Sequence, residues 1–251
     1  MNHFAVKPFA AALLILTFGA TQAHAAIALD RTRVIYTAAE KSVSLSITNQ
    51  NKQLPYLAQG WLEDEHGTKI TSPLIVLPPI QRLEPGASSQ LKIQGLPAIA
   101  SLPKDQESLF YFNLREIPPR SEKTNTLQIA LQTRIKLFYR PDALVPQRDS
   151  TQAPWQEKIT LTRQDNRYVV NNPTPYYVTL IDAKSSFKSE SAEDFEPLMI
   201  APNTQGKLSV NAQALGQAPV LTYINDFGGR PQLQFACTSN TCSVNPSAKA
   251  P

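Results

Sequence analysis

Apolar and polar residues alternate along the stretch 125–141. The apolar side chains on every second position of this stretch are Leu127, Ile129, Leu131, Ile135 and Leu137. A two-residue period is typical of a half-buried β-strand. At about 3.3 Å per residue the predicted strand is on the order of 40 Å long, whereas a usual strand has about 5 to 6 residues. Two interpretations stay open: the strand spans a large sheet, or part of it is an edge that pairs with another chain.

Shorter runs of the same kind recur along the chain, and no convincing helical stretch separates them. The runs that we expect to form strands are 43–47, 56–62, 74–77, 91–93, 109–117, 158–162, 168–170, 176–181, 207–210, 221–224 and 232–237. They carry β-branched and aromatic residues, and proline-rich breaks lie between many of them. This pattern predicts an all-β protein built from antiparallel sandwiches. We expect Trp61 to be a core tryptophan of the first sandwich.

The pattern of residues changes after Arg140. Residues 142–154 form a polar stretch that contains prolines and has no periodicity, which is typical of a linker. We therefore predict a first sandwich domain over 26–141 and a second over 155–251. Two domains in series have a cleft between them, and such clefts are common binding sites.

The first 25 residues are typical of a secretory signal peptide. Lys7 supplies a positive charge, residues 9–20 an apolar run of about 12, and Ala23-His24-Ala25 a small-x-small cleavage site. This run is too short to span a membrane, and no later run reaches the roughly 18 residues that a spanning helix needs. We expect an exported, soluble mature chain that begins at Ala26.

Composition speaks against several functions. Without Lys7 the formal net charge falls from +4 to +3, and no basic run carries interleaved aromatic residues, so nucleic acid is not an expected partner. His66 is the sole histidine of the mature chain, and it lies in a polar turn. No nucleophile motif, P-loop or dinucleotide fingerprint occurs. We therefore predict no enzymatic activity, no catalytic residue and no cofactor.

The two cysteines are Cys237 and Cys242, which flank a turn-like Thr-Ser-Asn-Thr. A short, even pair in an exported chain favours a disulfide. A metal site is not expected, because two thiolates need two further ligands and only one histidine remains.

Seven separated segments together resemble the periplasmic pilus-assembly chaperones of the chaperone–usher class, in matching order over nearly the whole mature chain. The segments are 29–36, 54–59, 82–86, 107–119, 127–141, 172–179 and 223–231. The resemblance implies two immunoglobulin-like β-sandwich domains in an L-shaped arrangement. It also implies a periplasmic chaperone that binds, folds and caps pilus subunits by donor-strand complementation and delivers them to an outer-membrane usher.

The same resemblance implies roles for particular residues. Leu127, Ile129 and Leu131 match the donated strand, which inserts alternating apolar side chains into an incomplete subunit. Arg33 and Lys136 match the cations that anchor the subunit's C-terminal carboxylate. The positions that match a charge cluster between the domains are Glu107, Arg140 and Asp226. A Cys237–Cys242 disulfide also matches close family members. Strict alternation places Lys136 on the opposite face from the donated side chains, so the two sites use different faces or a bulge intervenes.

Two other classes of protein remain as alternatives. An exported two-domain binding protein, adhesin or pilus structural protein is also β-rich, although pilin-like subunits usually have one domain. A periplasmic hydrolase needs a nucleophile, a base and an orienting group, which His66 alone does not supply. Whether the free protein self-associates as a dimer to cover Leu127 to Leu131 stays open.

Overall fold

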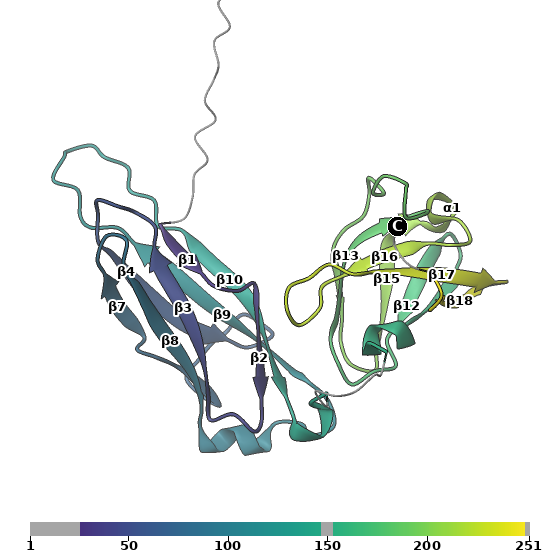
Figure 1. Cartoon of the computed structure of the whole chain (residues 1–251), viewed down its shortest axis with the longest axis horizontal. Coiled ribbons are helices and arrows are strands. Elements are labelled where there is room, and N and C mark those ends of the chain that lie inside the picture. The colour runs from purple at the N-terminus through teal and green to yellow at the C-terminus, as the bar shows by residue number, and fades with distance from the viewer. Residues whose placement is uncertain (1–25, 147–152, 249–251) are drawn as a thin grey trace, which may run out of the picture.

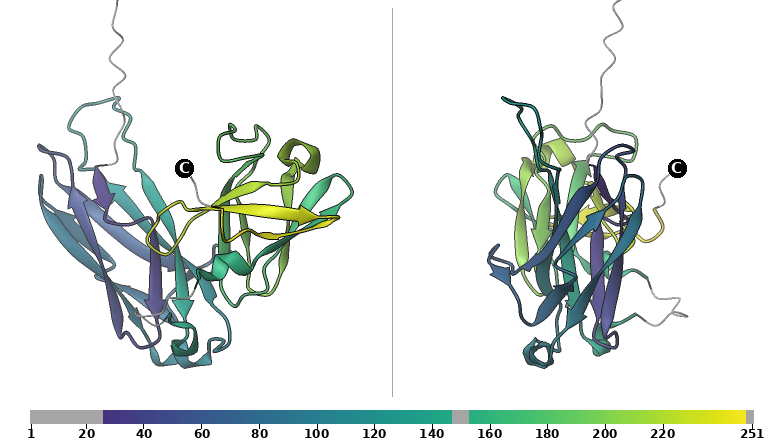
Figure 2. Two further views of the ribbon diagram at one scale, coloured as in Figure 1. Left: turned by 45° about the vertical axis from the view of Figure 1, so that its right-hand side comes forward. Right: turned by 90° about the vertical axis from the view of Figure 1, so that its left-hand side faces the viewer.

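The computed structural model describes residues 26–146 and 153–248. The predicted signal peptide lies outside these residues. Two separate hydrophobic cores form, one from residues between Ile27 and Tyr139 and one from residues between Ile159 and Cys242. The all-β prediction is confirmed, and the chain folds as two β-sandwich domains. In Figures 1 and 2 the domains lie at an angle, near each other around the chain connection and farther apart at their opposite ends.

The first domain consists of two facing sheets. One sheet has the order β1-β3-β8-β6, and its strands are β1 (Ile27–Leu29), β3 (Ser42–Asn49), β8 (Ser88–Gly95) and β6 (Leu74–Leu77). The other has the order β2-β10-β9-β4-β5, with β7 also paired to β4. Its strands are β2 (Arg33–Thr37), β10 (Gln132–Arg140), β9 (Ser108–Ile117), β4 (Tyr56–Glu63), β5 (Lys69–Ile70) and β7 (Ile80–Leu83).

The second domain contains a continuous path of eight strands, in the order β14-β13-β16-β17-β18-β11-β12-β15. The strands are β11 (Thr160–Gln164), β12 (Arg167–Asn171), β13 (Val178–Lys184), β14 (Leu198–Ile200), β15 (Gln205–Asn211), β16 (Val220–Tyr223), β17 (Gln232–Thr238) and β18 (Thr241–Val244). Cys237 and Cys242 face each other across the β17–β18 hairpin and form the predicted disulfide.

Helices are short in the part of the chain that the structure describes. They are η1 (Pro97–Ser101), η2 (Asp142–Leu144), η3 (Trp155–Lys158) and α1 (Ala212–Leu215). No helix among these residues is long and apolar enough to cross a membrane. The short elements η2 and η3 lie at the two ends of the connection between the domains, within or next to the predicted linker.

The expectation of one strand over 125–141 is wrong at its N-terminal end, because β10 begins at Gln132. The neighbouring strand explains the difference. Gln132 pairs with Arg115 of β9, and the last backbone hydrogen bond on this side joins Glu116 N–H to Leu131 O at 3.0 Å. β9 ends just before Pro118-Pro119, which lack the N–H groups that a ladder needs. Leu127, Ile129 and Leu131 therefore lie outside the strand.

The expectation that Trp61 is a core residue is also wrong. In β4 the inward positions are those of Ala58, Gly60 and Leu62, and Trp61 has the opposite parity. Its half-buried indole lies on the outer face of the sheet, where Nε1 donates a hydrogen bond of 3.0 Å to Glu63 Oε1. Arg115 lies over the same ring, 5.2 Å from its centroid. The core of the first domain is formed without Trp61, by residues such as Phe112.

Candidate functional site: an unpaired strand edge beside two cations

The chain crosses from one sheet of the first domain to the other between β1 and β2. This crossing makes β2 a parallel neighbour of β10, with Arg33 opposite Lys136 and Thr37 opposite Arg140. Because residues opposite each other in a ladder share a face, the side chains of Arg33 and Lys136 lie together on the outer face of the sheet. Their nearest inward-facing neighbours, Val34 and Leu137, are fully buried and hold both strands against the core.

Both cations point toward the second domain. Arg33 is 9% exposed, and its Nη1 donates a hydrogen bond of 3.1 Å to the carbonyl oxygen of Ile224. Its guanidinium lies 5.8 Å from the ring centroid of Phe138, while its Nε is buried without a hydrogen-bond partner. Lys136 Nζ donates to the hydroxyl of Thr179 at 3.4 Å. Neutral oxygens of the second domain are therefore the acceptors for these two cations.

Neither cation has a counter-charge in contact. Within residues 26–146 and 153–248, no carboxylate oxygen lies within 4.0 Å of a nitrogen of Arg33 or Lys136. Burial, together with the nearby charge of Arg33, lowers the pKa of Lys136 from 10.5 to about 8. Burial likewise lowers the pKa of Arg33, an effect that the more distant charges of Asp226 and Glu107 oppose. Two like charges held together in a half-buried place favour an anion that can accept hydrogen bonds from both.

The outer edge of β10 is unpaired on the N-terminal side of these cations. β2 begins at Arg33, so its pairing with β10 covers only residues 136–140. Residues 132–135 of β10 pair with β9 on one side and, among residues 26–146 and 153–248, with no strand on the other. An edge of this kind presents free backbone donors and acceptors to an incoming strand.

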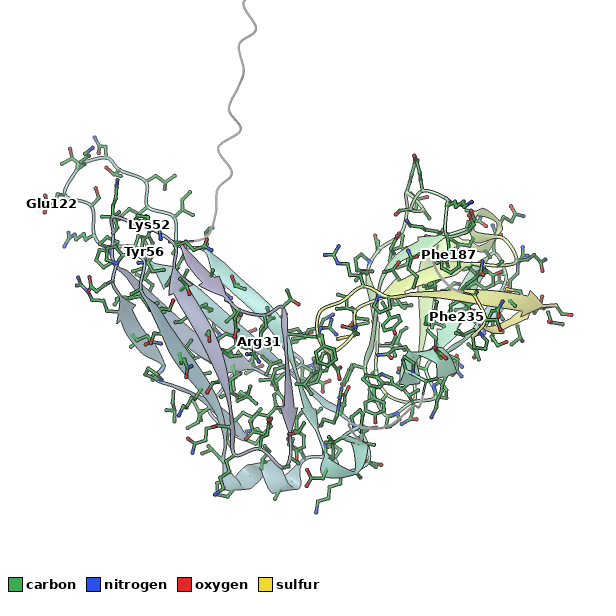
Figure 3. All side chains as sticks on the ribbon, viewed as in Figure 1. Arg31, Lys52, Tyr56, Glu122, Phe187 and Phe235 are labelled. Atoms are coloured by element: carbon green, nitrogen blue, oxygen red, sulfur yellow. A yellow bond between two sulfur atoms is a disulfide. The ribbon has the colours of Figure 1, made fainter. Side chains whose placement is uncertain are left out.

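The apolar triplet Leu127, Ile129 and Leu131 continues from this edge. These side chains are 85%, 65% and 40% exposed, so they do not face the core of their own domain. The β9–β10 connection that carries them projects beyond the end of the first domain in both views of Figure 2. A pocket of about 700 Å³ lies between Leu127 and Ile129 on one side and the β3–β4 connection at Leu54 on the other. Figure 3 shows Glu122, Lys52 and Tyr56 at this same end, far from the second domain.

The three charged residues Glu107, Arg140 and Asp226 meet between the domains. Arg140 Nε donates a hydrogen bond to Glu107 Oε1 at 2.8 Å, and Nη1 and Nη2 donate to the two carboxylate oxygens of Asp226 at 2.7 and 3.1 Å. Glu107 Oε2 accepts the backbone N–H of Tyr177 at 2.8 Å. Burial raises the pKa of the Glu107 carboxyl, an effect that the charge of Arg140 opposes.

Sequence reasoning missed the aromatic surroundings of this cluster. Arg140 lies 5.0 Å from the ring centroid of Trp155 and 5.1 Å from that of Tyr176, and these two rings stack at 4.4 Å. The hydroxyl of Tyr176 donates to the carbonyl of Leu144 at 2.7 Å, and Phe138 packs on Tyr177 at 5.5 Å. No local pattern marks these residues, because their partners are 15 to 39 positions away along the chain.

The described part of the chain holds no group of three or more histidine, cysteine, aspartate or glutamate side chains arranged to bind a metal ion. His66 is in the exposed β4–β5 turn, where its backbone N–H donates to Asp64 Oδ1 at 3.0 Å. The site therefore consists of a backbone edge, apolar side chains and two cations. Such a site can bind an extended polypeptide that ends in a carboxylate.

Comparison with known proteins follows the same division into two domains. The family model described as pili and flagellar-assembly chaperone, PapD N-terminal domain, matches residues 26–145. The model described as pili assembly chaperone PapD, C-terminal domain, matches residues 154–235. The predicted resemblance is thereby confirmed.

Individual relatives match over most of their length. The chaperone protein PapD of Escherichia coli is 52% identical over 223 residues, which cover 88% of this chain and 91% of PapD. The chaperone protein PmfD of Proteus mirabilis is 41% identical over 256 residues, covering 100% of this chain and 99% of PmfD.

Two solved structures show the same similarity. The periplasmic chaperone SfaE has a TM-score of 0.67 at 32% identity and covers 83% of this chain and 98% of its own. The SafB chaperone structure, solved as a complex with the Salmonella enterica SafA pilin, has a TM-score of 0.70 at 26% identity, covering 86% and 98%.

Proposed function

This chain belongs to the PapD family of pili and flagellar-assembly chaperones, and from that premise we propose that it is a periplasmic chaperone for pilus subunits. It binds a subunit whose own sandwich lacks a strand and donates residues 127–131 and the free edge of β10 in its place. Arg33 and Lys136 hold the C-terminal carboxylate of the subunit. The chaperone then delivers the subunit to an outer-membrane usher. There, another pilus subunit replaces the strand that the chaperone had donated.

One observation carries this proposal. In the described part of the chain, two cations with no carboxylate within 4.0 Å lie at the end of an unpaired strand edge, and that edge leads to three exposed apolar side chains on alternate positions. Exposed apolar side chains have an unfavourable free energy of hydration unless a partner covers them. Buried cations have an unfavourable desolvation free energy unless an anion binds to them. A polypeptide strand that ends in a carboxylate satisfies all three parts of the site at once.

The position of the anchor sets the direction of the bound strand. β10 runs from Gln132 toward Lys136, so a strand along its free edge that ends at Lys136 runs parallel to it. β2 is also parallel to β10 and begins at Arg33. The bound strand therefore lies end to end with β2 and extends the sheet of the first domain along β10.

The donated side chains and the anchor use different faces. Leu127, Ile129 and Leu131 share the parity of Ile135 and Leu137, which face the core of the first domain. Lys136 has the opposite parity and faces the second domain. The apolar groove of the subunit is therefore filled from one face of the bound edge, while its carboxylate is held from the other.

Localisation is part of the same proposal. The Cys237–Cys242 disulfide is a bond that forms and persists in oxidising compartments such as the bacterial periplasm. The relatives named above are chaperones, and the SfaE structure is that of a periplasmic chaperone. These comparisons do not favour the alternative of an adhesin or pilus structural protein.

The test is a pull-down from the periplasm of pilus-producing cells with the mature protein and with Lys136→Ala. We expect pilus subunits, identified by mass spectrometry, to co-purify with the wild type and to be lost with the variant, because the carboxylate then loses one of two charge-assisted partners. Removing one partner of such a pair typically costs about 2 to 5 kcal/mol. Circular dichroism checks that the variant is folded.

The matched control is Lys92→Ala, which removes an equal charge from an exposed position in β8 of the opposite sheet. It should recover subunits as well as the wild type does. Equal recovery with a folded Lys136→Ala would reject the anchor. Absence of any pilus subunit from the wild-type sample would reject the chaperone function itself.

A further inference from the structure

One large aromatic side chain is fully presented to solvent next to the anchor. Phe227 is 97% exposed and lies in the β16–β17 connection, residues 224–231. Figure 1 shows this connection extending from the second domain toward β2. Single exposed apolar residues are common on protein surfaces. Phe227 differs from them in two respects, which are the rigidity of its support and the pocket beside it.

The backbone around Phe227 is held on both sides. Asn225 Oδ1 accepts the backbone N–H groups of Phe227 and Gly229 at 3.1 and 2.8 Å, and Asp226 is held by two hydrogen bonds to Arg140. Gly228 has φ +81°, a conformation that favours glycine. An aromatic side chain with two rotatable bonds on a fixed backbone loses little conformational entropy when a partner packs on it, and aromatic residues are frequent among those that dominate interfaces.

The pocket lies between the two domains and has a volume of about 450 Å³. Its walls are formed by the β1–β2 crossing, by the cleft-facing side chains of β2 and by the β16–β17 connection. The lining residues are Asp30, Arg31, Thr32, Arg33, Ile35, Asp226 and Phe227. The connection closes against the crossing, since a Cβ atom on Gly228 would lie 2.8 Å from Thr32 Oγ1.

We propose that this pocket receives the side chain of the last residue of the bound polypeptide, and that Phe227 selects a large apolar or aromatic residue there. The inference rests on the proposed function, because it takes the carboxylate at Arg33 and Lys136 as given. Arg33 belongs to both sites, so a chain terminus held at its guanidinium has its final side chain next to the pocket. Phe227 and Ile35 supply apolar surface to that side chain, and the Asp30–Arg31 ion pair forms a polar wall.

The occupant of the pocket follows from its continuity with the proposed anchor. A terminus that occupies the anchor must place its last side chain within a few ångströms of Arg33. The face shared with Lys136 is already in use by the carboxylate, and the pocket is the adjoining free space on the side of Arg33. A large apolar side chain there would cover Phe227, which is 97% exposed in the free protein.

The test uses short synthetic peptides of alternating valine and threonine that end in either phenylalanine or alanine. Each peptide is prepared with a free carboxylate and as an amide. Affinities are measured by fluorescence anisotropy for the mature wild type, Phe227→Ala, Phe227→Trp and Lys136→Ala. Because Phe227 is exposed, replacing it should leave the fold intact. Phe187→Ala, which removes a partly buried phenylalanine from the β13–β14 connection of the same domain, is the control.

We expect the wild type to bind the phenylalanine-ended acid more tightly than the alanine-ended acid. In a double-mutant cycle, Phe227→Ala and the change of the terminal residue should be coupled by about 2- to 10-fold in affinity, the range of an aromatic pair. Phe227→Trp should retain the preference and Phe187→Ala should not alter it. A cycle without coupling overturns the inference.

The failure of the inference is distinguishable from that of the proposed function. If free carboxylates bind better than amides and Lys136→Ala removes that difference, the anchor stands whatever the Phe227 variants show. If carboxylate and amide bind equally, or if no peptide binds the wild type, the proposed function fails and the pocket assignment fails with it.

Discussion

Arg33 and Lys136 illustrate how the fold keeps residues in a state that is unfavourable for stability. The chain desolvates both cations and places them opposite each other in a parallel ladder, with only neutral oxygens as acceptors. The lowered pKa of Lys136 implies a free-energy cost of its charge in the folded protein, because the folded protein binds the proton less tightly than the unfolded chain does. Binding sites commonly retain such unsatisfied groups at the expense of stability.

Lys136→Met should therefore stabilise the free protein while abolishing carboxylate binding. The folded pKa of about 8 lies below the unfolded value of 10.5, so the penalty is fully present below pH 8 and is relieved as pH rises toward 10.5. Since Lys136 is only partly buried, solvent screening reduces the gain to on the order of 1 to 2 kcal/mol at pH 7. Urea unfolding at pH 7 and pH 10 tests this. A variant that is less stable than wild type at pH 7 would contradict it.

At the scale of elements, the end of β9 decides what the following segment can do. The ladder with β10 stops at Leu131 because the two prolines after β9 donate no backbone hydrogen bonds, and β2 starts too late to pair with this part of the chain. Within the residues that the structure describes, the apolar triplet therefore has no strand paired to it, and only Leu131 retains a backbone hydrogen bond to β9. Its exposure is a consequence of strand lengths and not of the triplet itself.

Ile129→Ser should weaken subunit binding with little effect on stability. The side chain is 65% exposed in the free protein, so the free energy of unfolding should change by less than about 0.5 kcal/mol. Burying an isoleucine in the groove of a partner contributes about 1.5 to 3 kcal/mol, so affinity should fall about tenfold or more. The affinity of each chaperone variant is measured by titration with a purified pilus subunit, which the wild-type chaperone keeps folded beforehand. Leu77→Ser in β6 is the control, and an equal loss with both variants would argue against a specific donated strand.

At the scale of the whole molecule, the angle between the domains rests on a few contacts with known chemistry. Arg140 of the first domain is held at its edge by Glu107 and Asp226 and over its faces by Trp155 and Tyr176. We propose that this cluster sets the angle that brings Ile224 and Thr179 to the two cations. We expect the cluster to contribute little net free energy to folding, because desolvating three charges offsets much of their attraction. Its main effect is then on the orientation of the domains.

Asp226→Asn should loosen the orientation of the domains without unfolding either of them. The amide keeps the shape of the side chain but loses the charge that pairs with Arg140, and Glu107 still neutralises the guanidinium. We expect distances between spin labels on the two domains to spread over a wider range than in wild type. Asp182→Asn, which removes a charge paired with Lys184 inside the second domain, should leave the distribution unchanged. An unchanged distribution in Asp226→Asn would contradict a role in setting the angle.

The pattern of residues alone determined the fold class, the positions of most strands and the disulfide. These features depend on local periodicity, turn residues and cysteine count, which the chain carries in itself. The predicted domain limits at 141 and 155 remain a proposal, although the two cores fall on either side of them. Trp61 was placed wrongly, because periodicity sets two faces of a strand apart but does not say which one is inside.

The tertiary structure decided which residues of that pattern remain available to bind a partner. The alternation from Leu127 to Leu137 reads as one strand, and only the lengths of β9 and β2 show that its first half lacks partners. Arg33 and Lys136 are more than a hundred positions apart and become a pair only through the crossing from β1 to β2. Phe227 is an ordinary loop residue until the domain interface brings it to Arg33. Sequence patterns describe what each residue prefers nearby, whereas a binding site depends on which distant backbones the packed fold leaves side by side and which edge it leaves open.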